Sequence, residues 1–213
     1  MAPDSPRRLL PPEAVDEAVQ ALLAGQLVVF PTDTVYGIGG LAEDEEAVRR
    51  IYRVKRRPFS MALPVMLADA SAVATVARET AGFAALARAF WPGPLTIILP
   101  RQPALPAIVT AGGDTVALRI PDHPLALQVL RSVARPLAVT SANLSGHPPA
   151  CTAAEALAQL RDPGILFLDG GRAPEGRAST IVDLTTTPAR ILRRGPISAQ
   201  AIAQVLGKPV ETP

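Results

Sequence analysis

The sequence predicts a single α/β domain built on a twisted, open, mixed sheet with flanking helices. Segments with helical spacing of apolar residues alternate with short apolar runs along most of the 213 residues. Hydrophobic residues make up 48% and charged residues 19%, which is typical of a chain with a substantial core. The last three expected strands are joined by short loops, and parallel neighbours would need longer crossovers. The sheet is therefore expected to be mixed.

The first part of the chain is expected to contain helices over 13–24 and 44–57 and a buried strand over 27–30. Glycine ends the first helix. An aspartate caps the second, and the proline at position 58 prevents its continuation.

The middle part is expected to contain strands over 63–67, 95–99 and 115–120 and helices over 80–91 and 124–133. Prolines set one boundary of each of these two helices. A Pro-Gly-Pro sequence ends the first, and a proline lies in the first turn of the second.

The last part contributes four expected strands and two expected helices. The strands are 137–140, 165–168, 180–184 and 189–192. Thr152 and Glu155 form a capping box for a helix that ends near Arg161. Ser198 caps the final helix, which stops at Gly207.

The ends of the chain are expected to lie outside the domain. Residues 1–12 are rich in Pro and Arg and predict a loose arm, 13–207 predict the domain, and 208–213 predict a frayed tail. No secretory signal and no apolar run of about 20 residues is present, so we expect a cytoplasmic protein with no membrane association. A single cysteine, Cys151, excludes an intrachain disulfide, and with only two histidines no Cys/His zinc site is expected.

Several motifs for nucleotide binding and hydrolysis are missing or misplaced. Residues 37–42 spell G-x-G-x-x-A, but six residues separate this run from the strand that should directly precede it, which argues against a dinucleotide fold. The usual P-loop and the G-x-S-x-G elbow are missing. His123 and His147 lie in loops with no identified nucleophile as partner, where a histidine is more often structural or exposed.

Four polar clusters lie at the ends of expected strands or helices, where α/β sites usually form. They are 31–37, 55–58, 140–146, and a group made of Arg119, Ser179, Thr180 and Arg193. Together they offer cations, hydroxyls and amides but no metal cage. This chemistry suits an anionic ligand such as a phosphate or a carboxylate.

The second cluster ends a strongly basic run in which six of the nine residues 49–57 are Lys or Arg. For Arg49, Arg50 and Arg53 we favour a solvated helix face near the C-terminal dipole. Lys55 and Arg57 would point about 200° apart on a regular helix, but an unwound end would bring both onto one ligand. The chain has 19 Arg and only two Lys, which makes the compact ammonium of Lys55 a candidate phosphate-handling group.

Six motifs occur in the order found in the YrdC-type family of threonylcarbamoyl-AMP synthases. They are 31–37 (Pro-Thr-Asp-Thr-Val-Tyr-Gly), 55–58 (Lys-Arg-Arg-Pro), 119–124 (Arg-Ile-Pro-Asp-His-Pro), 141–143 (Ser-Ala-Asn), 179–183 (Ser-Thr-Ile-Val-Asp) and 192–193 (Leu-Arg). Each motif alone is weak, but the ordered set is specific. The chain resembles the short, single-domain form of this family over roughly residues 13–207.

The resemblance implies a YrdC-like sheet with a concave, positively charged face and the activity of a nucleotidyltransferase. Its substrates would be L-threonine, bicarbonate and ATP, and its products L-threonylcarbamoyladenylate and pyrophosphate. The adenylate would pass to the tRNA threonylcarbamoyl-transferase machinery, which modifies adenosine 37 of ANN-decoding tRNAs. Weak direct binding of tRNA is a further expectation.

The resemblance also implies roles for individual residues. The residues expected to bind threonine are Thr34, Arg119, Val139 and Ser179. Those expected to bind ATP are Arg57, Thr115, Ser141, Pro149 and Arg193. The catalytic signature is matched by Lys55, Arg57, Ser141 and Asn143, and no residue is expected to bind a metal. The chain departs from the family pattern at Met61, Met66 and Arg194, and a methionine cannot donate the hydrogen bond of an Asn or His.

The implied reaction needs positioning and charge stabilisation more than a protein nucleophile. Threonine's amine would form a carbamate, whose oxygen attacks the α-phosphate of ATP and expels pyrophosphate. Lys55, Arg57 and Arg193 suit the developing charge, with Mg²⁺ bridging the phosphates, and Arg119 would hold the threonine carboxylate or the carbamate. The sequence identifies no general base.

Two other functions compete with the synthase. The first is an RNA-binding protein of the same fold without synthase activity, with the basic run 49–57 as its footprint. Aromatic residues make up only 4% and no RNA-recognition motif is present, which argues against it. The second is a carbamoyl-transfer module of the hydrogenase-maturation type. Such modules belong to larger chains with zinc-finger-like cysteines, which a single cysteine cannot supply.

Overall fold

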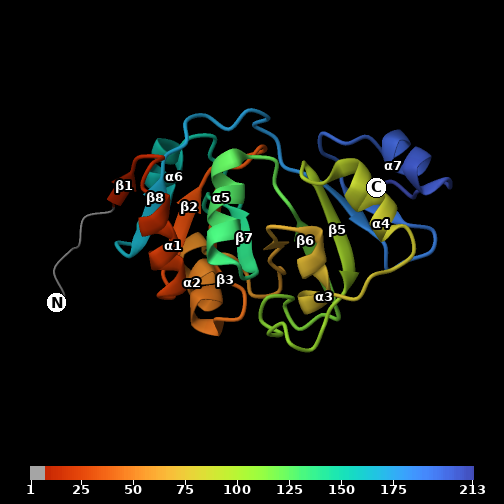
Figure 1. Cartoon of the computed structure of the whole chain (residues 1–213), viewed down its shortest axis with the longest axis horizontal. Helices are drawn as coiled ribbons and strands as arrows, with labels where there is room; N and C mark the ends of the chain where they lie inside the picture. The colour runs from red at the N-terminus through yellow and green to blue at the C-terminus, as the bar shows by residue number, and fades with distance from the viewer. Residues whose placement is uncertain (1–7) are drawn as a thin grey trace.

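Ten strands form one mixed sheet in the computed structural model, which describes residues 8–213. The sheet order is β1-β8-β2-β3-β7-β4-β6-β5-β9-β10 (Figure 1). The strands are β1 (Arg8–Leu10), β2 (Leu27–Phe30), β3 (Gly37–Leu41), β4 (Val65–Met66), β5 (Leu95–Pro100), β6 (Thr115–Arg119), β7 (Leu137–Ser141), β8 (Ile165–Leu168), β9 (Thr180–Asp183) and β10 (Arg190–Arg193).

The pairing confirms the expectation of a mixed sheet. Strands pair in parallel at β1–β8, β2–β8, β4–β6 and β5–β9, and the remaining neighbours are antiparallel. Of the three closely spaced last strands, β9 and β10 are antiparallel neighbours. In contrast, β8 lies in the other half of the sheet, between β1 and β2.

Seven α-helices and one short 3-10 turn connect the strands within residues 8–213. They are α1 (Val15–Leu23), α2 (Glu45–Lys55), η1 (Ala70–Ala72), α3 (Val73–Val76), α4 (Phe83–Phe90), α5 (Pro124–Val133), α6 (Ala153–Gln159) and α7 (Ala199–Leu206). The expected caps are present: Asp44, Thr152 and Ser198 each accept backbone N–H bonds at the start of their helix. Figure 1 shows α1 beside α5 and α4 beside α7.

Strand β2 shows how the core forms on both faces of the sheet. Leu27 and Val29 belong to a cluster that includes residues of α2 and α6, whereas Val28 and Phe30 belong to a second cluster with residues of α1 and α5. Successive side chains of a strand point to opposite faces. A continuous apolar run is therefore what a strand covered on both sides requires.

Strand β3 is the main element that the sequence analysis missed. Its glycines lie close to the neighbouring strand β7. A Cβ at Gly37 would lie 2.8 Å from Val139 Cγ1, and one at Gly39 would lie 2.9 Å from Val139 Cγ2. The G-x-G-x-x-A run therefore forms a strand that needs close backbone packing, not a phosphate-binding loop.

The expected loose ends are partly wrong. Of the arm predicted over 1–12, residues 1–7 lie outside the described part, but Arg8–Leu10 form β1, which pairs with β8. The tail predicted to fray over 208–213 is tied to β10: Ile191 N donates to Glu211 O (2.8 Å) and Glu211 N to Ala189 O (2.9 Å). Both segments gain ladder bonds at a sheet edge, which composition alone does not reveal.

The segment between β8 and β9 crosses the molecule from one half of the sheet to the other, along the top of Figure 1. Tyr36 anchors its start. The Tyr36 hydroxyl donates to Gly171 O (2.5 Å) and accepts from Gly170 N (3.1 Å). Further along, Glu175 N donates to Asp33 O (3.2 Å). The crossing segment is therefore bonded to the polar run that follows β2.

Candidate functional site

A cavity of about 450 Å³ lies over one face of the central strands. Alternate residues of three strands face it: Thr96 and Ile98 of β5, Ala117 and Arg119 of β6, and Val139 and Ser141 of β7. Residues two apart on a strand share a face, so the sheet itself forms the floor. The walls come from the segments that follow β2, α2 and β7 and that precede β9.

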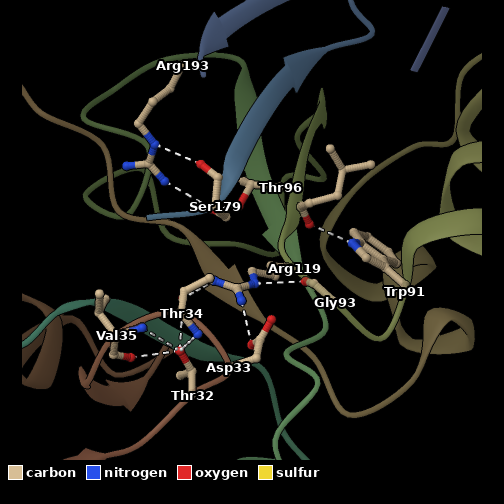
Figure 2. A network of polar contacts seen from close by, with 11 residues as sticks. Thr32, Asp33, Thr34, Val35, Trp91, Gly93, Thr96, Arg119, Ser179 and Arg193 are labelled. Atoms are coloured by element: carbon tan, nitrogen blue, oxygen red, sulfur yellow. Dashed lines mark hydrogen bonds and ion pairs between the residues drawn. The ribbon is translucent and has the colours of Figure 1, made fainter. Parts of the chain in front are cut away.

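Arg119 is the most deeply buried cation of this cavity, at 5% exposure. Its Nη2 donates to Asp33 Oδ1 (2.5 Å), its Nη1 to Thr34 Oγ1 (2.8 Å), and its Nε to Gly93 O (3.0 Å). Figure 2 shows the three partners converging on the guanidinium. Burial lowers the pKa of Arg119, and the Asp33 carboxylate opposes that shift. A guanidinium has five N–H groups, so two remain for a ligand.

A second network, drawn above the first in Figure 2, positions Arg193 at the end of β10. Arg193 donates to Ser179 O through Nε (2.9 Å) and to Ser179 Oγ through Nη2 (3.0 Å). Ser179 Oγ also lies 2.7 Å from Thr96 Oγ1. The pKa of Arg193 is lowered by burial first, and then by the positive charges of Arg119 and Arg57. The guanidinium groups of Arg57, Arg119 and Arg193 therefore make this cavity electrostatically positive.

Arg57 enters the cavity because helix α2 ends abruptly. Arg56 adopts the left-handed conformation (φ 51°), and Arg57 N donates to Tyr52 O (2.9 Å). The Arg57 side chain is then held by Met61 O (Nε, 3.1 Å) and Ala62 O (Nη2, 2.8 Å). The helix end unwinds as expected, but Lys55 and Arg57 do not reach a common partner.

Lys55 is buried beneath the segment that follows β7, with only 1% of its surface exposed. Its Nζ donates to Ser141 O, to Asn143 O (2.6 Å) and, at 3.4 Å, to Asn143 Oδ1. Burial and the neighbouring Arg57 lower the pKa of Lys55 to about 7. Lys55 itself does not line the cavity.

Nine of the eleven residues expected from the sequence line this cavity. They are Thr34, Arg57, Arg119, Val139, Ser141, Asn143, Pro149, Ser179 and Arg193. The two others are Lys55 and Thr115. Thr115 is exposed at the start of β6, four residues and therefore about 13 Å from Arg119 along the strand. Met66 lines the cavity, whereas Met61 contributes a backbone carbonyl to Arg57.

Thr32, Tyr36, Thr96 and His147 also line the cavity, although the sequence analysis assigned them no individual role. Thr32 Oγ1 accepts from Thr34 N (3.2 Å) and donates to Val35 O (2.7 Å), which shapes the turn after β2. Burial raises the pKa of Tyr36 to about 12. The polar run 31–37 signalled Thr32 and Tyr36, but no local signal marked Thr96 inside an apolar strand.

Three arginines of the basic run 49–57 are ion-paired, whereas Arg56 of the same run is exposed. Arg49 pairs with Glu45 (2.7 Å), Arg50 with Asp162, and Arg53 with Glu46. The exposed pairs of Arg49 and Arg53 agree with the solvated helix face that the sequence favoured, whereas Arg50 is partly buried against the loop before β8. The three carboxylates offset part of the positive charge that an RNA footprint on this run would need.

The cavity chemistry does not fit a metal held by protein ligands. No Asp or Glu lines it, and residues 8–213 contain no group of three or more His, Cys, Asp or Glu side chains placed to hold a metal ion. Two larger hollows, of about 670 and 580 Å³, lie elsewhere on the described surface. The larger one also has three arginines and an amide, but it has no hydroxyl and includes Asp162, and the other includes two carboxylates and only two arginines. Every helix within 8–213 is too short or too polar to span a bilayer.

The chain belongs to the Sua5/YciO/YrdC family, whose model carries the description telomere recombination and matches residues 20–195. A putative threonylcarbamoyl-AMP synthase of Mycobacterium tuberculosis (strain ATCC 25618 / H37Rv) is 45% identical over 191 residues, which cover 89% of this chain and 88% of that protein. The threonylcarbamoyl-AMP synthase of Bacillus subtilis (strain 168) is 42% identical, with 91% of this chain and 56% of that protein covered.

Solved structures share this fold. The crystal structure of P. abyssi Sua5 complexed with L-threonine superposes with a TM-score of 0.90 at 36% identity, covering 96% of this chain and 62% of that chain. The present chain therefore spans a little over half the length of the Bacillus and Pyrococcus proteins.

Proposed function

We propose that this protein is an enzyme, a threonylcarbamoyl-AMP synthase. It would convert L-threonine, bicarbonate and ATP into L-threonylcarbamoyladenylate and pyrophosphate. The synthases of M. tuberculosis and B. subtilis, at 45% and 42% identity, support this activity, as does the threonine complex of P. abyssi Sua5. The observation that carries the proposal is one cavity with three arginines and no carboxylate on its lining.

The threonine end of the site is proposed at Arg119, Thr34, Ser179 and Val139. Arg119 keeps two N–H groups that are not used by its protein partners, enough for a bidentate carboxylate contact. Asp33 and Gly93, which do not line the cavity, hold the guanidinium plane of Arg119 in place. The site is thus preorganised before substrate enters, which reduces the entropy that binding must overcome.

The ATP end is proposed at Arg57, Ser141, Pro149 and Arg193, with Asn143 beside them. Arg193 has its Nε and Nη2 held by Ser179, so the rest of its guanidinium is available to phosphate oxygens. Thr115, which the resemblance also assigns to ATP, does not line the cavity but shares the face of β6 with Ala117 and Arg119, so its contact with ATP stays a prediction.

The chemistry follows from this arrangement. The amine of threonine and bicarbonate give a carbamate and water. A carbamate oxygen then attacks the α-phosphorus while the bond to the β-phosphate oxygen breaks, releasing pyrophosphate. Fixed guanidinium groups stabilise the charge that grows on the phosphoryl oxygens, without a protein nucleophile. Because no carboxylate lines the cavity, we infer that any Mg²⁺ arrives with the triphosphate.

The test is pyrophosphate release by the purified protein, which should require ATP, threonine and bicarbonate together. Salt-dependent RNA binding without such turnover would replace the synthase with the RNA-binding alternative. We further propose that the adenylate passes to the tRNA threonylcarbamoyl-transferase machinery in the cytoplasm, with at most weak direct binding of tRNA by this chain.

Arg193→Ala should raise the KM for ATP about tenfold or more, because a charged hydrogen bond to phosphate is lost. Arg190→Ala is the matched control, since Arg190 lies on the same strand and pairs with Glu211 at the surface. Equal kinetics for the two variants would refute the assignment of Arg193.

A further inference from the structure

We propose that Lys55 is a positioning residue: its ammonium holds the 141–147 turn in the shape that presents Ser141 and Asn143 to the cavity, and it does not contact the phosphates. The 141–147 turn means the end of β7 and the residues up to His147. This inference rests on the proposed function for its kinetic consequence. Its structural part can be tested without any substrate.

The first support is that Lys55 has no donor left for a ligand. An ammonium has three N–H groups. The two carbonyls of Ser141 and Asn143 and the side-chain oxygen of Asn143 supply three acceptors. With 1% exposure and no place on the cavity lining, Lys55 lies behind the site.

The second support is a main-chain hydrogen bond between the end of α2 and the same turn. Ser145 N donates to Lys55 O (2.8 Å), so both the backbone and the side chain of the last residue of α2 bind the turn. Asn143 connects this contact to the rest of the turn, because its Nδ2 donates to Leu144 O (2.8 Å) and His147 O (2.7 Å). The end of α2 and the turn form one hydrogen-bonded unit.

The third support is the contrast with Arg57. The left-handed residue Arg56 separates the two cations, so Lys55 points under the turn while Arg57 lines the cavity. The two cations of the K-x-R sequence thus have different roles. Lys55 holds the 141–147 turn in place, and Arg57 faces the cavity. Arginine cannot replace the lysine here, because a planar guanidinium does not fit a fully enclosed site shaped for an ammonium.

The test compares Lys55→Met with Arg57→Ala in the ligand-free protein by amide hydrogen exchange at about pH 6, below the pKa of about 7 of Lys55, where its side chain is an ammonium. Lys55→Met leaves buried carbonyls without a donor, so exchange at Ser145 and His147 should accelerate about tenfold or more. Arg57→Ala should leave the same amides within about twofold of wild type. In turnover assays, Lys55→Met should raise the KM for ATP and leave the Kd for threonine unchanged.

Lost activity of Lys55→Met with unchanged exchange in the turn would overturn the proposal and assign Lys55 a direct contact with substrate. Full activity with a loosened turn would overturn it as well. If Lys55→Met does not fold, Lys55→Gln replaces it: its shorter amide side chain has only two N–H groups, so exchange at Ser145 and His147 should still accelerate, and unchanged exchange there refutes the proposal. A wild-type protein without synthase activity refutes the proposed function but leaves the exchange result intact.

Discussion

Arg119 brings a positive charge into a nearly closed interior, where an ion is stable only with partners. Asp33 supplies the counter-charge, while Thr34 and Gly93 accept two further hydrogen bonds. Asp33 Oδ2 is buried and has no hydrogen-bond partner among the described residues. The pair therefore depends on a single charged contact.

Arg119→Ala should lower the free energy of unfolding by about 3–5 kcal/mol, because it leaves the Asp33 carboxylate buried without its partner. Denaturant unfolding measures this loss. Arg190→Ala removes an exposed ion pair instead and should cost no more than about 1 kcal/mol. Similar losses for both variants would show that the buried pair has no special role.

Lys55 should also affect stability through proton linkage. Burial, and then the charge of Arg57, lowers the pKa of Lys55 to about 7 in the folded protein, from 10.5 in its ordinary state. The unfolded chain therefore binds more protons between these two values, and the contribution of Lys55 to stability rises with pH across that window.

The wild-type protein should gain stability relative to Lys55→Met as the pH rises from about 7 to 10, with a slope of at most about 1.4 kcal/mol per pH unit. Unfolding by denaturant at several pH values gives the difference between the two proteins. Parallel pH profiles for wild type and variant are the outcome that contradicts this linkage.

Among the elements, β3 packs closely against β7, which is one of the strands of the cavity floor. Gly37 and Gly39 let the two strands approach so closely that Val139 fills the space of two missing side chains. Val139 in turn lines the cavity. A change in β3 should therefore be transmitted to the floor of the site.

Gly39→Ala should destabilise the protein by about 1–3 kcal/mol, because its Cβ would overlap Val139 Cγ2 at 2.9 Å. Adding Val139→Ala should recover part of this loss, so that the two changes are not additive. The free energies of unfolding of the two single variants and the double variant provide the measurement. Strict additivity would mean that the two side chains do not compete for space.

Most elements were predictable because their signals are local. The range 124–133 is the helix expected from its proline start, and 165–168 is the strand expected from its apolar run. Strand β3 was not, since a glycine-rich run has low strand propensity and forms here through packing on Val139. The edge strand β1 and the anchored tail depend on partners far along the chain.

At the scale of the whole molecule, the site is assembled from strands that are distant in sequence. Resemblance to the family indicated nine residues of the cavity lining, because its motifs lie at strand ends that meet over one sheet face. Thr115 does not line the cavity but lies on the same face of β6 as Ala117 and Arg119, so its contact with ATP stays a prediction. Thr96 and the buried position of Lys55 required the fold, since neither strand register nor side-chain direction can be read from a motif.

The most direct test of the central claim follows labelled carbon from bicarbonate. With ATP and threonine present, the purified protein should incorporate the label into an adenylate and release pyrophosphate. Omission of threonine should abolish both, and Arg190→Ala should leave both unchanged. If the label stays in bicarbonate while ATP and threonine are present and the protein is folded, the proposed synthase activity is wrong.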